Sequence, residues 1–143
     1  MVKLYISLCL ILFTSCFSTK SFLKYDQIPN DFGKGNKPIS ITPFSKDRIN
    51  NIILNAFEKY YKGPYSCVTD DKLLINFGYN FNTYIDYYTT NTVSGNIERD
   101  NDIQFRLTDL ETKKVYKTFG FGYAKTKAKY YIQALEIVRQ RNQ

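Results

Sequence analysis

The chain contains no histidine and no tryptophan among its 143 residues. Histidine is the commonest general base in enzymes and the commonest nitrogen ligand of protein-bound metals, so its absence removes Ser-His and Cys-His catalysis together with most zinc chemistry. The four prolines and seven glycines are too few for a fibrous or disordered chain. The remaining residue types are suited to binding, and we expect no catalytic residue, no metal and no cofactor.

The abundant residues are aromatic and basic. There are 13 tyrosines and 11 phenylalanines, and the formal net charge is +7. Hydrophobic residues make up 43% of the chain and charged residues 23%, which is ordinary for a folded protein. Because domains cluster at roughly 100 to 150 residues, we expect a single folded domain.

The amino-terminal end has the pattern of a signal peptide. Lys3 is followed by an apolar run at 4–13 and then by small residues up to Cys16. Only 16 residues separate Lys3 from the next charged residue, fewer than the roughly 20 apolar residues that a membrane span needs. We expect residues 1–15 to be removed by cleavage between Ser15 and Cys16. A plain secreted protein and an uncleaved anchor are the alternatives.

The stretch Leu12-Phe13-Thr14-Ser15-Cys16 resembles the lipobox of bacterial lipoproteins, in which small residues precede a cysteine that is acylated. The resemblance implies that Cys16 becomes the first residue of the mature chain and carries acyl chains of the palmitate type. Phe13 departs from the leucine that the family prefers. Two or three acyl chains, at about 0.8 kcal/mol per buried methylene, anchor a domain firmly on a bilayer. The implied location is the cell envelope, facing the periplasm or the exterior, with the choice between inner and outer membrane left open.

The three cysteines agree with this interpretation. Cys9 would leave with the signal peptide and Cys16 would carry lipid, so Cys67 would be the remaining thiol and no disulfide could form within the mature chain. Cys67 lies between apolar and small residues, and we expect it to be a small buried hydrophobe rather than a reactive thiol.

The mature chain divides into a spacer and a domain. The segment from Phe17 to Lys37 is rich in Ser, Thr, Lys, Asn, Asp and Gly and has no sustained hydrophobic periodicity. We therefore expect the lipidated cysteine and a flexible tether at 16–37, followed by a single domain at 38–143.

Two helices are predicted within this domain. Ile39 and Ile41 alternate with polar residues as in a short strand. Apolar spacings of three and four then predict an amphipathic helix, with start signals at Pro43 and Ser45 and a stop at Lys62-Gly63-Pro64. This helix is expected to stop where Gly63 can form a left-handed cap. A second helix is expected at the carboxyl end, with an apolar stripe at Ala124, Ala128, Tyr131, Leu135 and Val138.

Between the helices the hydrophobic period changes to two. Alternation predicts strands at 79–88, 103–108 and 114–119. The short apolar run at 72–77 is a further candidate, and connections at 94–96 or 98–102 and at 111–113 are short enough for antiparallel hairpins. We expect an α+β two-layer sandwich, with an antiparallel sheet of three to five strands and an N-terminal and a C-terminal helix packed on one face.

One hairpin carries a second resemblance. The run from Phe105 to Thr118, with the turn Asp109-Leu110-Glu111-Thr112-Lys113-Lys114-Val115, resembles the strand-turn-strand of small periplasmic lipoproteins related to the TolB amino-terminal domain and the penicillin-binding-protein activators. The resemblance implies an envelope protein that binds another protein and has no active site.

Charge is distributed unevenly along the domain. The segment 70–111 has a balance of −5, whereas 113–143 has a balance of +7. A basic end of this kind can approach an anionic leaflet or an acidic partner. Lys127 lies near the apolar stripe of the last helix, and we expect its charged end to reach solvent. The candidate partner-binding residues are Tyr84, Tyr88, Lys125, Lys129 and Tyr130.

The acidic residues offer other chemistries. Asp70 and Asp71 are adjacent, so on a strand their side chains would point to opposite faces. Glu98, Asp100 and Asp102 alternate as calcium ligands do, but no closing glutamate or loop glycine accompanies them. We expect a solvated hairpin loop there.

Together these features favour a membrane-anchored envelope lipoprotein whose domain binds a protein partner without catalysis. A periplasmic immunity or inhibitor protein against a toxin or hydrolase is one alternative, and a carboxylate-dependent glycan-acting enzyme is another. The expected partners are the lipid bilayer, through acylated Cys16, and an envelope protein. Export argues against nucleic acid in spite of the basic charge, and glycan contact through exposed tyrosines stays open.

Overall fold

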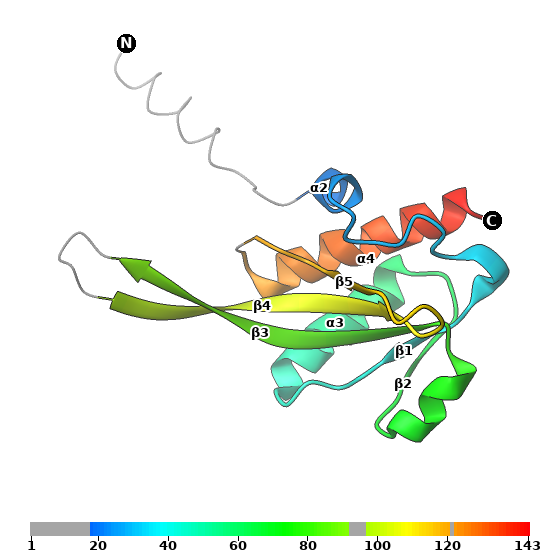
Figure 1. Cartoon of the computed structure of the whole chain (residues 1–143), viewed down its shortest axis with the longest axis horizontal. Helices are drawn as coiled ribbons and strands as arrows, with labels where there is room; N and C mark the ends of the chain where they lie inside the picture. Colours follow the sequence, from blue (N-terminus) through cyan, green and yellow to red (C-terminus); the bar gives the residue numbers. More distant parts are fainter. Residues whose placement is uncertain (1–17, 92–96, 121) are drawn as a thin grey trace, which may run out of the picture.

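In the part of the chain that the structure describes, five strands and three α-helices form one α+β domain (Figure 1). The structure, a computed structural model, describes residues 18–91, 97–120 and 122–143. The sheet has the order β2-β1-β3-β4-β5. Its strands are β1 (Ile39–Ile41), β2 (Tyr65–Cys67), β3 (Tyr79–Asn91), β4 (Ile97–Asp109) and β5 (Val115–Lys117). The helices are α2 (Thr19–Lys24), α3 (Asp47–Tyr60) and α4 (Ala124–Arg141), with short 3-10 helices η1 (Lys34–Asn36) and η2 (Asp71–Asn76).

The predicted fold class is confirmed. Helices α3 and α4 lie side by side on one face of the sheet, and β3, β4 and β5 pair antiparallel as expected. The sheet is nevertheless mixed, because β1 pairs parallel with both β2 and β3. The reason is the connection: β1, α3 and β2 form a strand-helix-strand crossover, which returns the chain in the same direction. Residue alternation and short connections predict hairpins alone, which is why an antiparallel sheet was expected.

The core is a continuous stack of aromatic rings between the sheet and the helices. Phe57 of α3 meets Phe81 of β3 with ring centroids 5.1 Å apart. Phe105 of β4 stacks on Tyr131 of α4 at 6.0 Å. All four side chains are fully buried. Aromatic pairs at such separations add to the free energy gained from burying their area.

The expected flexible tether at 16–37 is wrong for its described part, residues 18–37. Helix α2 begins at Thr19, and Phe22 packs against Tyr131 with ring centroids 5.3 Å apart. Phe32 is fully buried, and the Tyr131 hydroxyl donates a hydrogen bond to the Gln27 carbonyl at 3.0 Å. Isolated apolar residues in a polar segment show no periodicity, yet Phe22 packs on Tyr131 of α4 and Phe32 packs on Tyr61 and Tyr79. The folded domain therefore includes residues 18–37.

Two smaller expectations about local structure are also wrong. The run 72–77 forms the 3-10 helix η2 rather than a strand, and the Asp70 carboxylate caps it by accepting a hydrogen bond from the Lys72 amide at 2.9 Å. The run 98–102 belongs to β4, where it pairs with 86–90 of β3, and is not a loop. The alternative connection at 94–96 lies outside the described residues.

The end of α3 and the environment of Cys67 differ from expectation as well. Helix α3 ends at Tyr60, before the predicted stop at Lys62-Gly63-Pro64. The Tyr61 amide closes it on the Phe57 carbonyl at 2.9 Å, and Gly63 has no left-handed conformation. Cys67 is exposed rather than buried, because β2 is a three-residue edge strand that pairs with β1 alone.

Candidate functional site

The predicted partner-binding residues fall on two sides of the molecule. Side chains alternate along a strand, so Tyr84 lies on the sheet face opposite Phe81 and hence opposite the helices. Lys125, Lys129 and Tyr130 lie on α4, on the helix side. The side chain of Tyr88 lies outside the described part of the structure. The five residues therefore do not form one site.

On the sheet face that carries Tyr84, several side chains contact one another, although the buried Arg106 Nε has no hydrogen-bond partner in the described part of the chain. The Arg106 guanidinium lies over the Tyr84 ring, 4.8 Å from its centroid. Burial, reinforced by the carboxylate of Asp86, raises the pKa of Tyr84. Asn80 donates hydrogen bonds to the hydroxyls of Ser40 at 2.9 Å and Thr42 at 2.8 Å. None of these side chains lines any of the three hollows described next.

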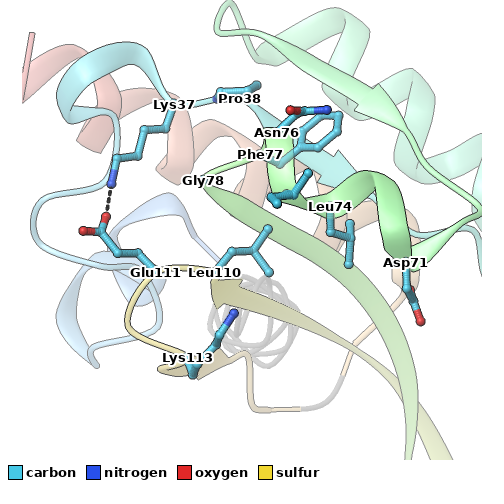
Figure 2. Close-up of a pocket in the computed structure, with 11 residues that line it drawn as sticks. Lys37, Pro38, Asp71, Leu74, Asn76, Phe77, Gly78, Leu110, Glu111 and Lys113 are labelled. Carbon is cyan, nitrogen blue, oxygen red and sulfur yellow. Dashed lines mark hydrogen bonds and ion pairs between the residues drawn. The ribbon is translucent and has the colours of Figure 1, made fainter.

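The first hollow lies between η2 and the β4–β5 turn and has a volume of about 680 Å³ (Figure 2). Figure 2 shows Lys37 and Glu111 pointing toward each other at its side, where they form an ion pair. Phe77, Leu74 and Leu110 supply its apolar wall. Because this hollow contains both acids and bases, we call it the mixed hollow.

The second hollow lies between α2 and the carboxyl end of α4 and has a volume of about 590 Å³. We call it the α2 hollow. Lys24, Lys114 and Arg141 contribute positive charge to it, and Asp26 contributes the acid. The Lys114 ammonium lies 3.4 Å from the Asp26 carboxylate, so part of this charge is neutralised.

The third hollow, which we call the amino-end groove, lies where the amino ends of α3 and α4 meet. Its volume is about 590 Å³. Ile49 and Ile52 of α3 and Ile103 of β4 provide its apolar lining. Its other lining residues include Lys46, Arg48, Lys125 and Tyr123, whose side chain is 87% exposed.

The amino-end groove differs from the other two hollows in its charge. Three basic residues and no acidic residue line it. Within the described ranges, none of Lys46, Arg48 and Lys125 takes part in an ion pair. Positive charges beside an apolar surface attract a partner segment that has both an acidic group and an apolar side chain. This groove is therefore the best candidate binding site.

Local backbone contacts fix the walls of the groove. Lys46 is the residue before the first turn of α3, and its carbonyl accepts hydrogen bonds from the amides of Ile49 at 3.0 Å and Asn50 at 3.2 Å. Tyr123 holds the same position in α4, where its carbonyl accepts from the Lys127 amide at 2.9 Å. Both residues thus belong to helix ends with a defined geometry.

A buried ion pair lies next to the groove, and it corrects the expectation that Lys127 reaches solvent. Lys127 is fully buried, and its ammonium donates to the Asp102 carboxylate at 2.7 Å and to the carbonyls of Ile103 and Gly120 at 2.8 Å each. Burial lowers the pKa of Lys127, against the opposing effect of Asp102. These bonds join the first turn of α4 to β4 and so hold Lys125 and Ile103 on opposite sides of the groove.

The acidic candidates form no comparable site. Asp86 and Asp102 are direct partners in the β3–β4 ladder, but Asp102 is bound to Lys127 and neither residue lines any of the three hollows. Among residues 18–91, 97–120 and 122–143, no group of three acidic or cysteine side chains could hold a metal ion. The side chains of Glu98 and Asp100 lie outside the described part.

Lys125 was predicted from the sequence as a partner-binding residue, but the other residues that line the amino-end groove were not. Lys46 and Arg48 begin one predicted helix and Tyr123 precedes the other, and only the packing of the helices in the same direction brings these ends together. Tyr87 was also missed: it lies on the same sheet face as Ile103 and is 69% exposed. Tyr84 lies on the other face. A basic or aromatic residue at the start of each helix is the signal that could have indicated the groove.

Comparison of the chain with protein-family models, with curated proteins and with solved structures gives no significant match. No α-helix in the described ranges combines the length and the apolar character required to cross a bilayer.

Proposed function

We propose that this protein is a membrane-anchored lipoprotein of the cell envelope, and that its domain binds a protein partner through the amino-end groove without catalysing a reaction. The observation that carries the proposal is the set of three cations in the groove, Lys46, Arg48 and Lys125, beside an isoleucine lining and without a neutralising acid. The predicted acylation of Cys16 supplies the anchor.

The chemistry of the groove indicates what kind of segment it binds. Ile49, Ile52 and Ile103 offer apolar surface to an aliphatic or aromatic side chain, and burying such a side chain contributes about 1.5–3 kcal/mol. The surrounding ammonium and guanidinium groups favour carboxylates on the same segment. The exposed ring of Tyr123 offers a further contact of the kind that is enriched at protein interfaces. The occupant is therefore an acidic segment with an apolar anchor residue.

The β3–β4 ribbon offers a second contact beside the groove. Strand β1 pairs with β3 only at 79–81, and β5 pairs with β4 only at 106–108. Beyond these positions the two long strands pair with each other and with no other strand in the described part of the chain. Figure 1 shows this ribbon extending past the helices. A partner that occupies the groove can therefore also lie along an unpaired strand edge.

Site-specific photo-crosslinking tests the proposal. A photoreactive phenylalanine analogue replaces Tyr123 in the full chain in its native cells, and the matched control carries the same group at Ile75, which is 88% exposed and does not line the groove. We expect position 123 to capture a specific envelope protein that position 75 does not capture. If the captured protein is an exported toxin or hydrolase, the result would assign an inhibitor role to this domain.

Charge variants test whether the crosslinked product depends on the amino-end groove. We expect Arg48→Glu to abolish the product and Arg48→Lys to retain it. Lys125→Glu is expected to weaken it, whereas Lys129→Glu, one turn further along α4 and outside the groove lining, is expected to leave it unchanged. Equal products at positions 123 and 75, or a product unaffected by Arg48→Glu, would contradict binding at the groove.

A further inference from the structure

The packing of residues 18–37 limits how far the domain can lie from a lipid on Cys16. Only Phe17 and Ser18 separate Cys16 from the start of α2 at Thr19. An extended chain spans at most about 3.6 Å per residue, so the anchor lies within about 11 Å of α2. A domain held by so short a connection has α2 as the element nearest the bilayer.

The exposed side of α2 carries the features of a membrane surface site. Lys20 and Lys24 are exposed and lie one helical turn apart, so they share a face. Tyr25 follows them with 58% of its side chain exposed, and Phe119 beside it is 52% exposed. The two rings meet edge to face with centroids 5.4 Å apart. Aromatic side chains of this kind are enriched at the level of lipid headgroups.

Basic residues from the turn before β5 and from α4 extend this surface. Lys114 and Arg141 line the α2 hollow together with Lys24, and Asp26 is its acidic lining residue. We call this set of residues, with Lys20, Tyr25 and Phe119, the α2 surface. Its basic residues outnumber its acid, so it complements the negative charge of an anionic leaflet.

We propose that the α2 surface lies against the headgroups of an anionic bilayer, with the Tyr25–Phe119 pair at the headgroup level. This inference rests on the proposed acylation of Cys16. The bilayer is the occupant because the short connection keeps it within reach at all times, whereas a soluble partner would have to displace it. Figure 1 shows α2 on the outer side of α4, away from the amino end of α3, so this orientation leaves the amino-end groove free.

Fluorescence quenching by brominated lipids tests the orientation, because the chain contains no tryptophan and a single introduced one is a unique probe. Full-length Phe119→Trp protein, produced with its lipid, is reconstituted in vesicles of phosphatidylglycerol and brominated phosphatidylethanolamine. The matched control is Ile75→Trp, since Figure 1 places the 71–76 segment on the side of the domain away from α2. We expect quenching several-fold stronger at position 119 than at position 75. Equal quenching at the two positions would overturn the proposed orientation.

Charge substitutions separate docking of the α2 surface from simple anchoring. In the Phe119→Trp protein, Lys20→Glu with Lys24→Glu is expected to reduce the quenching to the level seen in zwitterionic vesicles, because each basic residue near the surface contributes roughly fivefold to the association. The control pair Lys125→Glu with Lys129→Glu makes the same change in net charge on α4 and is expected to have no effect. Quenching that responds equally to both pairs would contradict a defined surface.

The mass of the amino-terminal peptide distinguishes the two ways in which the inference can fail. An acylated Cys16 with no difference between positions 119 and 75 overturns the orientation and leaves the lipoprotein proposal intact. A Cys16 without lipid overturns both, because the short connection to a membrane then no longer exists.

Discussion

The two ends of helix α4 contain similar groups in different arrangements. At the amino end, Lys127 binds Asp102 of β4, so the ion pair joins the helix to the sheet. At the carboxyl end, Arg139 binds Glu136 of the same helix, with 2.8 Å between the Arg139 Nε and a Glu136 carboxylate oxygen. Glu136 also accepts a hydrogen bond from the Lys62 amide at 3.0 Å. The first pair joins the helix to the sheet beside the amino-end groove. The second lies within the last turns of the helix and joins them to the segment after α3.

Two basic residues outside these ion pairs, Arg141 and Lys125, differ in how their charge interacts with the helix dipole. Arg141 lies in the last turn of α4, where a positive charge is favoured by the helix dipole. Lys125 lies in the first turn, which contains no acidic residue, so its charge opposes the dipole. A charge that stabilises its helix has a structural reason to be there. A charge that destabilises its helix needs another reason, and the binding proposed for the amino-end groove would supply it.

The largest expected effect comes from breaking the amino-end ion pair. Lys127→Met keeps most of the buried stem but leaves Asp102 without its counter-ion, with the Gln104 amide as its remaining side-chain donor in the described ranges. Removing one member of a buried pair costs about 3–5 kcal/mol. We expect a loss of about 3 kcal/mol in the free energy of unfolding, measured by urea denaturation. Adding Asp102→Asn is expected to restore part of that loss. A loss in Lys127→Met below about 1 kcal/mol, the size typical of exposed pairs, would contradict a buried pair.

A glycine tests the packing near the carboxyl end. Gly33 has a φ of +92°, and a Cβ atom there would lie 2.6 Å from the Arg139 Cα. Gly35 has a φ of +68° with no atom within 4 Å of such a Cβ. A left-handed conformation costs roughly 1–2 kcal/mol for other residues, so both alanine variants are expected to lose that much stability and Gly33→Ala about 1 kcal/mol more. Equal losses in thermal or urea unfolding would show that 18–37 does not pack on α4.

The carboxyl-end ion pair is expected to make stability depend on acid pH. Burial raises the pKa of Glu136, but hydrogen bonds from Arg139, the Lys62 amide and Gln140 outweigh it and leave the pKa below its ordinary value. A lowered pKa in the folded state contributes stability above the unfolded-state pKa, and this contribution disappears as pH falls through the folded-state value. Glu136→Gln is therefore expected to be less stable than the parent at neutral pH, with the difference narrowing below about pH 4. Urea denaturation at several pH values measures this, and a difference independent of pH would contradict the assignment.

The smallest expected effects compare the helix ends directly. Lys125→Glu places a negative charge in the first turn of α4 and is expected to raise stability by about 0.5 kcal/mol, while Arg141→Glu is expected to lower it by a similar amount. The same Lys125→Glu variant is expected to weaken partner crosslinking. Thermal unfolding at low salt measures both changes. A loss of stability in Lys125→Glu would give Lys125 a structural role and weaken the case for binding.

The sequence predicted those elements that have a strong hydrophobic period. The amphipathic spacing of Ile49, Ile53 and Phe57 and the alternation along 79–88 and 103–108 correspond to α3, β3 and β4. The packed segment 18–37 was missed because Phe22 and Phe32 are separate anchors without a period. The parallel pairing of β1 was missed because strand direction depends on the crossover through α3, which residue alternation does not encode.

The candidate site was predictable only in part. Lys125 was identified from its charge, but its relation to Arg48 and Ile103 depends on the packing of two helices on a sheet, which brings together residues distant in the chain. Lys127 shows the same limitation. A lysine near an apolar stripe normally reaches solvent, and only the positions of the Asp102 carboxylate and of the Ile103 and Gly120 carbonyls make full burial favourable.

Mass spectrometry of the protein isolated from membranes measures most directly whether this domain is held on a bilayer. The account predicts that the amino-terminal peptide begins at Cys16 and carries diacylglycerol on the sulfur, and that Cys16→Ser abolishes this modification. A protein that retains Met1, or a mature chain in which the Cys16 sulfur is unmodified, would contradict the proposed anchor and the orientation inferred from it.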